Sequence, residues 1–218
     1  MSKIISIEGN IGSGKSTILN YLKDLYKDSI EIIFLEEPVS EWSKIKDKNN
    51  ETILEKFYNN QKKYSFAFQM MAYISRLSIL KETIAKYPNA IIITERCLNT
   101  DRYVFAKMLY DDEKLEDVEY QIYINWFDHF SYLQKIQKTI YLKTDPHTCY
   151  NRINKRNRDG ESNISVDYLK SCHDYHENMI NTISINDILI INSNIDTEKD
   201  SNINNIWIND IKEFIYKS

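Results

Sequence analysis

Three of the four glycines in this sequence of 218 residues fall within six positions, which indicates a loop whose backbone approaches a ligand closely. The stretch reads Gly9-Asn10-Ile11-Gly12-Ser13-Gly14-Lys15-Ser16-Thr17 and has the spacing G-x-x-x-x-G-K-[ST]. Amides of such a loop point at phosphate groups, and the positive end of the following helix dipole adds to the attraction. We therefore expect the whole stretch to bind a nucleoside triphosphate, with Lys15 on the outer phosphates and the Ser16 hydroxyl on Mg²⁺.

Charged side chains also follow the next two apolar runs. Glu37 comes after one run, and Pro38 biases its backbone away from the α region, so that the carboxylate stands at a strand end. Glu95 and Arg96 come directly after another run. Because the carboxyl ends of parallel strands share one crevice, we expect these groups to converge on the phosphate loop. The three apolar runs are residues 4–7, 30–35 and 90–94.

A long helical pattern covers residues 61–86. Gln69, Ala72 and Arg76 follow one another at spacings of three and four, so they share a face. Polar groups so placed point either at solvent or at a ligand, and Asp101, beyond the next strand, is within reach of Arg76. The apolar side chains that we expect mostly in the core are Phe66, Met70, Tyr73, Ile74, Leu77, Leu80 and Ile84.

Three arginines, Arg152, Arg156 and Arg158, are expected on a helix that begins at Asp145-Pro146. They run into a polar turn at residues 157–163 that contains the last glycine. Arginines on a helix are usually solvated. Beside this turn they favour a lid that supplies guanidinium charge to a transferring phosphoryl group.

The rest of the pattern alternates short apolar strands with longer helices. Further strands are expected at residues 138–143 and 188–191, and further helices near residues 118–136, 166–183 and 206–215. This alternation predicts an α/β fold of the P-loop kinase type, with about five parallel strands, helices on both faces and an arginine-rich lid. No stretch rich in Pro, Gly or Ser divides the chain, so we expect residues 1–218 to form a single domain.

The charge and the composition of the chain limit the kinds of molecule that we expect it to bind. The net charge is −4 with both signs interspersed, so we expect a small anionic ligand and no nucleic acid. No apolar run has the length of a membrane span, and the first strand begins close to Met1, so we expect neither membrane binding nor a targeting peptide, and hence a cytoplasmic protein. The three cysteines and four histidines lack metal-ligand spacing, which favours free thiols and histidines at the surface or packed between helices.

On these residues the sequence resembles the deoxyribonucleoside kinase family, and within it the deoxycytidine and deoxyguanosine kinases. The resemblance covers roughly residues 3–180. It implies ATP as phosphate donor, Mg²⁺ as cofactor, a deoxynucleoside as small-molecule acceptor, a role in nucleotide salvage, and a homodimer. The motifs that carry it are Ile7-Glu8-Gly9-Asn10-Ile11 with Lys15-Ser16-Thr17, Glu37-Pro38-Val39 with Trp42, Tyr58, Phe66-Ala67-Phe68-Gln69, Ser75-Arg76, Glu95-Arg96, Thr100-Asp101-Arg102-Tyr103-Val104-Phe105, and Arg152 to Arg158 with Glu161.

The resemblance also implies catalytic roles. Glu37 resembles the general base that takes the proton from the nucleoside 5′-hydroxyl. Arg96 resembles the arginine that holds this hydroxyl together with the base. Glu95 resembles the acid beside Mg²⁺, opposite Ser16.

For the substrate, Tyr58 and Glu161 correspond to the pair that binds the sugar 3′-hydroxyl, and Gln69 to the amide that reads the edge of the nucleobase. Phe57 stands where the family more usually has methionine, and residues 192–196 match the adenine-binding loop only weakly. The residues implied to wall or stack the nucleobase are Trp42, Phe68 and Phe105, and those that fall on lid positions are Arg156 and Arg158.

The choice of nucleobase depends on Arg76 and Asp101, with Ala72 beside them. One interpretation is a salt bridge that only tethers two helices. The other is a charged pair at the floor of the pocket, in the space that a thymine methyl group would need. In the resembled family, Arg and Asp at these positions go with deoxycytidine and purine deoxynucleoside kinases, so we expect these nucleosides rather than thymidine as substrates.

Two other functions compete with this interpretation. A thymidylate kinase shares the fold and a similar Asp-Arg-Tyr run, but it needs cationic groups for the phosphate of its acceptor, where Glu37 places a negative charge. A nucleotide sensor or mechanical ATPase usually has a water-activating Asp or Asp-Glu and partner-facing insertions, which the sequence lacks. The hypothesis favoured by the sequence is an ATP- and Mg²⁺-dependent kinase that phosphorylates the 5′-hydroxyl of a deoxyribonucleoside.

Overall fold

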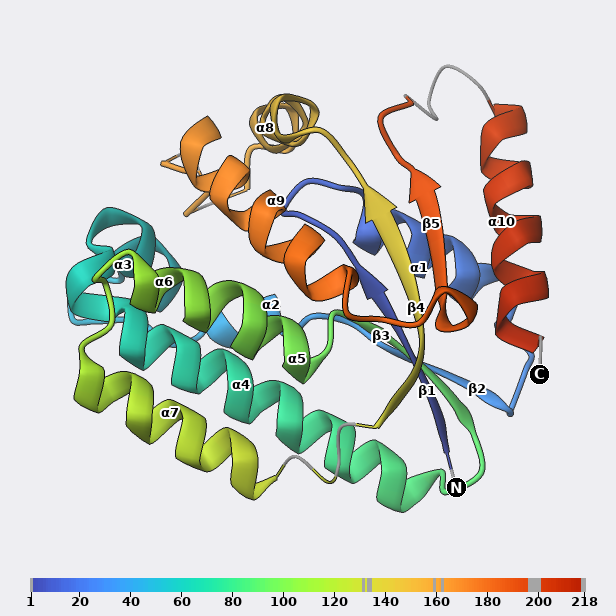
Figure 1. Ribbon diagram of the computed structural model, residues 1–218, viewed down its shortest axis with the longest axis horizontal. Helices are drawn as coiled ribbons and strands as arrows, with labels where there is room; N and C mark the ends of the chain where they lie inside the picture. Colours follow the sequence, from blue (N-terminus) through green and yellow to red (C-terminus); the bar gives the residue numbers. More distant parts are fainter. Residues whose placement is uncertain are drawn as a thin grey trace.

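The fold is built on a five-stranded parallel sheet with the strand order β2-β3-β1-β4-β5 (Figure 1). The computed structural model describes residues 2–130, 132, 135–158, 160–161, 163–195 and 201–216. This strand order places the carboxyl ends of β2, β3 and β1 next to one another, so the segments that follow them meet at one edge. The strands are β1 (Lys3–Glu8), β2 (Ile32–Leu35), β3 (Ile91–Glu95), β4 (Ile136–Lys143) and β5 (Ile188–Asn192).

Helices occupy most of the remaining chain. The longest, of 26 residues, begins after Asn60, whose side chain accepts a hydrogen bond from the Lys63 amide. No helix in the described ranges is both long and apolar enough to cross a membrane. The helices are α1 (Lys15–Leu25), α2 (Val39–Trp42), α3 (Ile53–Asn59), α4 (Gln61–Lys86), α5 (Leu98–Thr100), the π-helix η1 (Asp101–Ala106), α6 (Lys107–Asp111), α7 (Asp117–His129), α8 (Pro146–Arg156), α9 (Val166–Ile180), the 3₁₀ helix η3 (Ile185–Asp187) and α10 (Ser201–Tyr216).

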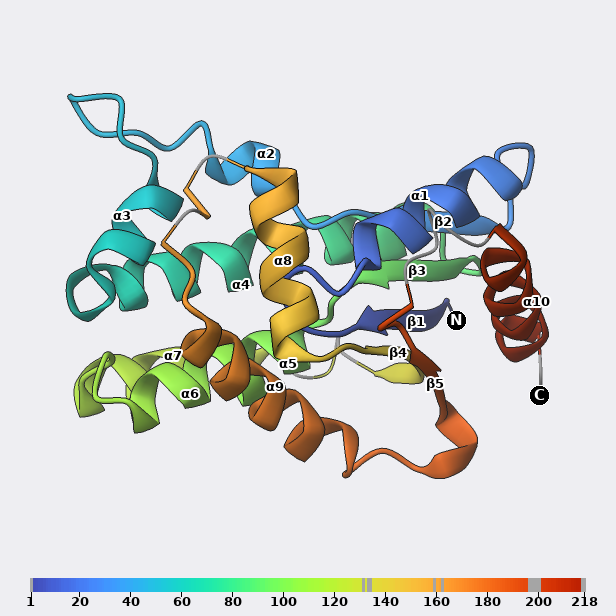
Figure 2. The same ribbon diagram turned by 90° about the horizontal axis from the view of Figure 1, so that it is seen from above.

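The sheet separates two hydrophobic cores, as the alternation along β1 shows. Ile4 packs in the cluster that includes side chains of α4 and α7, whereas Ile5 and Ile7 pack on the opposite face with side chains of α1 and α10. In Figure 2, α1 lies above the strands and α9 below them. Both faces of the sheet are covered, as a parallel sheet requires, which confirms the predicted fold class.

Several element boundaries differ from the sequence prediction. The second strand was expected from Ile30, but Ile30 is 88% exposed and pairing with β3 begins at Ile32. The helix expected over residues 118–136 ends at His129, because Ile136 already pairs with Ile4 as part of β4. The helix expected to reach residue 183 ends at Ile180, and α10 begins five residues earlier than expected, at residue 201.

One apolar residue of α4 is not in the core. Ile74 was expected there from its helical spacing, but its side chain is 52% exposed, whereas Tyr73, Leu77 and Leu80 are buried. Ile74 therefore lies on a side of α4 that the rest of the described chain leaves exposed.

Candidate active site

The glycine-rich loop joins β1 to α1 and has a backbone that only glycine supports without strain. Gly12 and Gly14 have φ angles of 80° and 97°, and a Cβ on Gly12 would lie 2.6 Å from the carbonyl oxygen of Cys149 in α8. α1 begins at Lys15, directly after Gly14, so the first amides of this helix open onto the loop. Loop amides and a helix N-terminus in this arrangement attract phosphate.

The residues of the loop divide into two groups. Ile11, Gly12 and the stretch from Gly14 to Thr17 line a large cavity, whereas the side chains of Asn10 and Ser13 are buried behind the loop. The Asn10 amide donates to the carbonyl oxygen of Leu169 in α9 at 2.8 Å, which fastens the loop to that helix. Asn10 therefore supports the loop through its side chain.

Lys15 is 4% exposed, and its Nζ donates to the carbonyl oxygen of Asn10 at 2.8 Å. Burial, together with the positive charge of Arg96, lowers the pKa of Lys15 to about 8. The ammonium is thus charged at neutral pH but poorly compensated. An incoming phosphate group supplies the missing negative charge, so the loop is prepared for an anion.

Ser16 and Glu95 lie together beside the loop, because the Ser16 hydroxyl donates to Oε1 of Glu95 at 2.9 Å. Mg²⁺ prefers oxygen ligands and is usually held by one or two protein side chains plus phosphate oxygens and water. The hydroxyl and the carboxylate fit such an ion. Within the described ranges no group of three or more His, Cys, Asp or Glu suits a metal, so a site made by protein side chains alone is not found there.

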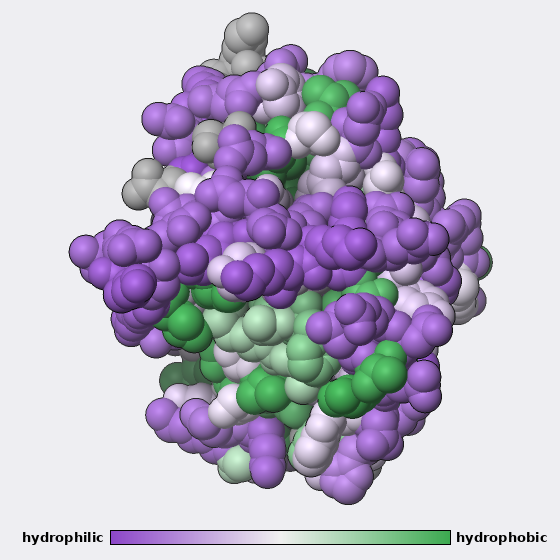
Figure 3. All heavy atoms as spheres, turned by 90° about the vertical axis from the view of Figure 1, so that its left-hand side faces the viewer, coloured by the Kyte–Doolittle hydropathy of each residue, from purple (hydrophilic) through white to green (hydrophobic). Residues whose placement is uncertain are grey.

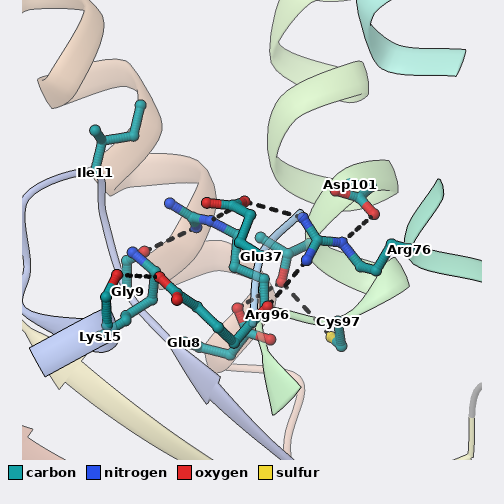
Figure 4. A network of polar contacts seen from close by, with 12 residues as sticks. Glu8, Gly9, Ile11, Lys15, Glu37, Arg76, Arg96, Cys97 and Asp101 are labelled. Carbon is teal, nitrogen blue, oxygen red and sulfur yellow. Dashed lines mark hydrogen bonds and ion pairs between the residues drawn. The ribbon is translucent and has the colours of Figure 1, made fainter. Parts of the chain in front are cut away.

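Glu37, just beyond β2, stands between two arginines (Figure 4). Its Oε1 lies 3.0 Å from Nη2 of Arg76 and 3.3 Å from Nε of Arg96. Burial raises the pKa of this carboxyl, but the charges of Arg96 and Arg76 outweigh that effect and lower the pKa to about 2. Glu37 therefore remains an anion throughout the physiological range.

Arg96 has a strained backbone and many contacts. Its φ is +63°, uncommon for a residue with a side chain, and its Nη1 donates to the carbonyl oxygen of Gly9 at 2.9 Å. The guanidinium carbon lies 4.9 Å from the centre of the Phe105 ring. Arg96 thus links β3, the phosphate loop and η1, which keeps its side chain in one place.

Arg76 of α4 makes a buried three-way contact. Its Nε donates to Oδ2 of Asp101 at 2.9 Å, its Nη1 to the carbonyl oxygen of Glu95 at 2.9 Å, and its Nη2 to Glu37. Gln69, Ala72 and Arg76 all line the cavity from the same helix. The pairing of Arg76 with Asp101 is confirmed, and the shared face of α4 points at the cavity and not at solvent.

Aromatic side chains form one end of the cavity. Phe57 and Phe68 stack with ring centres 4.5 Å apart, and Trp42 meets Phe68 edge-on at 5.6 Å. Trp42 is oriented by a hydrogen bond from its Nε1 to Ser75 at 2.9 Å. Phe57 therefore packs against Phe68 and also lines the cavity.

Most of these groups border one cavity of about 950 Å³. The glycine-rich loop lines one end of the cavity, and the aromatic side chains line the other. This arrangement suits a ligand that has a phosphate group at one end and an aromatic ring at the other. The predicted site residues that line it are Ile11, Gly12, Gly14, Lys15, Ser16, Thr17, Glu37, Trp42, Tyr58, Phe68, Gln69, Ala72, Arg76, Glu95, Arg96, Asp101, Phe105, Arg152, Arg156, Arg158 and Glu161.

Two of the three predicted lid arginines pair with a residue to which the resemblance gave a different role. Arg156 is the last residue of α8, whereas Arg158 lies beyond the end of this helix and not on it as expected. Arg156 and Arg158 form ion pairs with Glu161 at 2.5 and 3.4 Å, and Glu161 is buried. Arg152 donates to the carbonyl oxygen of Ile195 at 3.1 Å. The polar turn predicted at residues 157–163 includes positions 159 and 162, and the weakly matching loop at residues 192–196 includes position 196, all three outside the described residues.

Comparison with known proteins identifies the family. The family model described as "Deoxynucleoside kinase" matches residues 5–216 of this chain. The chain belongs to the deoxynucleoside kinase family. It is 33% identical to a probable deoxycytidine kinase of fowlpox virus, over 98% of this chain and 88% of that one. It is also 34% identical to human deoxycytidine kinase, over 82% and 75%, and 30% identical to a mitochondrial deoxyguanosine kinase of Xenopus laevis, over 98% and 89%.

Membership in the deoxynucleoside kinases confirms the resemblance seen in the sequence and the activity class that it implied. A nucleoside kinase needs a nucleotide phosphate donor and a nucleoside acceptor. The alternatives of a thymidylate kinase and of a mechanical ATPase or sensor are set aside by this match.

His176 was not predicted from the sequence as part of the deoxynucleoside kinase site, and neither were cavity-lining residues such as Tyr168 and Asn194. His176 is fully buried in α9, and its Nε2 lies 3.2 Å from Nη1 of Arg96. The signal available in the sequence is its spacing, because His176 continues an apolar stripe of α9 that includes Leu169, Cys172 and Met179. A histidine on such a stripe is either packed or bonded inside the protein, and this one is both.

Proposed function

We propose that this kinase transfers the γ-phosphoryl group of ATP to the 5′-hydroxyl of a deoxyribonucleoside and so forms the 5′-monophosphate for nucleotide salvage. The observation that carries the proposal is the Glu37 carboxylate, held as an anion between Arg76 and Arg96 in the same cavity as Lys15. A carboxylate suits a hydroxyl acceptor, because it takes up the proton, and it repels an acceptor that already carries a phosphate.

The transfer requires mainly positioning and charge. The 5′-oxygen attacks the γ-phosphorus, the bond from that phosphorus to the bridging oxygen breaks, ADP leaves, and the hydroxyl proton passes to Glu37. Lys15 and the loop amides hold the phosphates, while Arg96 holds the 5′-hydroxyl against Glu37. When Mg²⁺ is bound, with Ser16 and Glu95 as its protein ligands, it neutralises charge on the phosphates.

The acceptor occupies the aromatic end of the cavity. Gln69 is 2% exposed, and its amide both donates and accepts, as the edge of a nucleobase requires. Trp42, Phe68 and Phe105 wall or stack the base. The sugar 3′-hydroxyl binds Tyr58 and Glu161, both of which border the cavity.

Deoxycytidine or a purine deoxynucleoside is the favoured substrate. Arg76 and Asp101 form a charged pair that borders the cavity beside Ala72, and its polar atoms suit an amino-bearing base better than a methyl group. Arg76→Met combined with Asp101→Ala should therefore admit thymidine. Poor thymidine turnover by the double variant, with the other nucleosides still accepted, would contradict this role of the pair.

Arg152, Arg156 and Arg158 form a lid over the phosphates. In the described contacts Arg156 and Arg158 are paired with Glu161. When the triphosphate enters, these guanidinium groups turn to the phosphate oxygens, and Glu161 becomes free for the sugar. The same movement of the arginines thereby prepares the phosphate site and the sugar site.

We further infer a homodimer of single-domain chains, residues 1–218. Val118, Ile122 and Trp126 recur every four residues on α7 and are 41% to 65% exposed, and Ile74 of α4 is exposed as well. Figure 3, which faces the left-hand side of Figure 1, shows hydrophobic side chains gathered in its lower half. The cysteines are free thiols, which suits a reducing cytoplasm, and the net charge of −4 argues against a nucleic acid partner.

The test is an assay of phosphate transfer from ATP, with Mg²⁺, to each of the four deoxynucleosides and to thymidine monophosphate as a fifth acceptor. We expect monophosphate from deoxycytidine or the purine nucleosides and little from the thymidine compounds. Lys15→Ala is the control for transfer that depends on the site. Preferred phosphorylation of thymidine monophosphate would overturn the proposal, and efficient use of thymidine would overturn the assigned base preference.

A further inference from the structure

The two groups that His176 contacts determine which of its ring nitrogens carries a hydrogen. Its Nδ1 lies 2.6 Å from the carbonyl oxygen of Cys172, and its Nε2 lies 3.2 Å from Nη1 of Arg96. A carbonyl oxygen only accepts, so Nδ1 carries a hydrogen. A guanidinium only donates, so Nε2 carries none. The imidazole of His176 is therefore neutral, in the Nδ1–H form.

The surroundings of His176 also keep it neutral. Burial lowers the pKa of His176 well below its usual value, and the nearby charge of Arg96 lowers it further. Lys15 and His173 act in the same direction, and the Phe105 ring packs edge-on with centres 6.0 Å apart. A second proton on Nε2 would point at a guanidinium group, which the buried site does not tolerate.

Some N–H groups of Arg96 face protein acceptors, and others remain for a ligand in the cavity. Nε faces Glu37, and the two hydrogens of Nη1 go to the carbonyl oxygen of Gly9 and to His176. Within the described ranges no protein acceptor bonds to Nη2, and Arg96 borders the cavity. Nη2 is thus the donor that remains for a ligand, and the two acceptors on Nη1 determine the plane in which it lies.

We propose that His176 is a positioning residue, whose neutral Nε2 fixes the Arg96 guanidinium so that Nε faces Glu37 and Nη2 faces the reacting groups. The inference rests on the proposed function, in which Arg96 and Glu37 act on the 5′-hydroxyl. A neutral acceptor suits this role because it orients Arg96 without cancelling its charge. A carboxylate at this position would compete with Glu37 for the guanidinium.

Kinetics of two variants test the proposal. His176→Met removes the acceptor at similar volume, and we expect kcat to fall on the order of 10²-fold with little change in the nucleoside KM, because the reacting groups lose their alignment. His176→Gln places an amide oxygen near Nε2 and should be about tenfold faster than His176→Met. His173→Met, on the same helix, is the matched control and should keep the original kcat. Equal kcat for the original protein and His176→Met would overturn the proposal.

Long-range ¹H–¹⁵N spectra of the unmodified protein give a readout that does not depend on catalysis. We expect one imidazole, absent from His176→Gln, that stays neutral with hydrogen on Nδ1 between about pH 5 and 8. Hydrogen on Nε2, or titration in this range, would overturn the proposal. If the unmodified protein phosphorylates no nucleoside, the proposed function fails while the spectra still decide the state of His176. If it is active and His176→Met is equally active, only the positioning role fails.

Discussion

Removal of Asp101 should destabilise the kinase more than removal of Asp101 and Arg76 together. Arg76 is 6% exposed and bonds Asp101, Glu37 and the carbonyl oxygen of Glu95. Asp101→Ala leaves this buried cation with one carboxylate in place of two. The double change to Met and Ala removes the cation as well and fills most of its volume with an apolar chain.

The magnitudes follow from these contacts. Removal of one partner of a buried ion pair costs about 3–5 kcal/mol. Since Glu37 stays 3.0 Å from Arg76, we expect the lower part of that range, about 3 kcal/mol, for Asp101→Ala. Replacement of a buried pair by apolar residues is often close to neutral, but here it also takes a partner from Glu37, so about 2 kcal/mol is expected for the double variant.

The assay is urea denaturation of the original protein, Asp101→Ala, Arg76→Met and the double variant. Together they form a double-mutant cycle. Arg76→Met leaves Asp101 buried without its partner and should also cost about 3 kcal/mol, so we expect a coupling energy of about 4 kcal/mol between the two residues. If the free-energy losses of the single variants add up in the double variant, the two side chains are not energetically coupled, and our reasoning about the buried pair is wrong.

Four further predictions concern turnover. Lys15→Ala should abolish transfer without changing the circular dichroism spectrum, and near-normal turnover would refute the role of the loop. Burial and the charge of Arg96 lower the pKa of Lys15 to about 8, so the free enzyme loses this positive charge as the pH rises. We therefore expect kcat/KM for ATP to fall above about pH 8, whereas kcat should persist to higher pH. Glu37→Gln should lower kcat about 10²- to 10⁴-fold with nucleoside binding retained. Glu36→Gln, a control at an exposed residue, should lower kcat only slightly, and the reverse result would show that Glu36 is the base. Arg156→Ala should lower kcat more than nucleoside affinity in steady-state kinetics, and unchanged kcat with weakened nucleoside binding would contradict a lid.

Much of the candidate site can be predicted from short patterns in the sequence. The glycine spacing determines a loop that only small residues tolerate, and Gly12 shows why, since a Cβ there would meet the carbonyl oxygen of Cys149. Helical spacing in residues 61–86 places Gln69 and Arg76 on one face, because an α-helix repeats every 3.6 residues. Alternation of strands and helices leads to a parallel sheet, which brings Glu37 and Glu95 to the edge where the loop lies.

Only the tertiary structure decides which of these groups touch. Arg76 contacts Glu37 and Asp101 at sequence separations of 39 and 25, and such contacts depend on how α4 packs across the sheet. The packing of α9 turns His176 onto Arg96, and the packing of α4 leaves Ile74 exposed, although both lie on faces with an apolar pattern. Periodicity specifies the direction of a side chain from its own helix, but its partner is determined by what the other elements bring to that position.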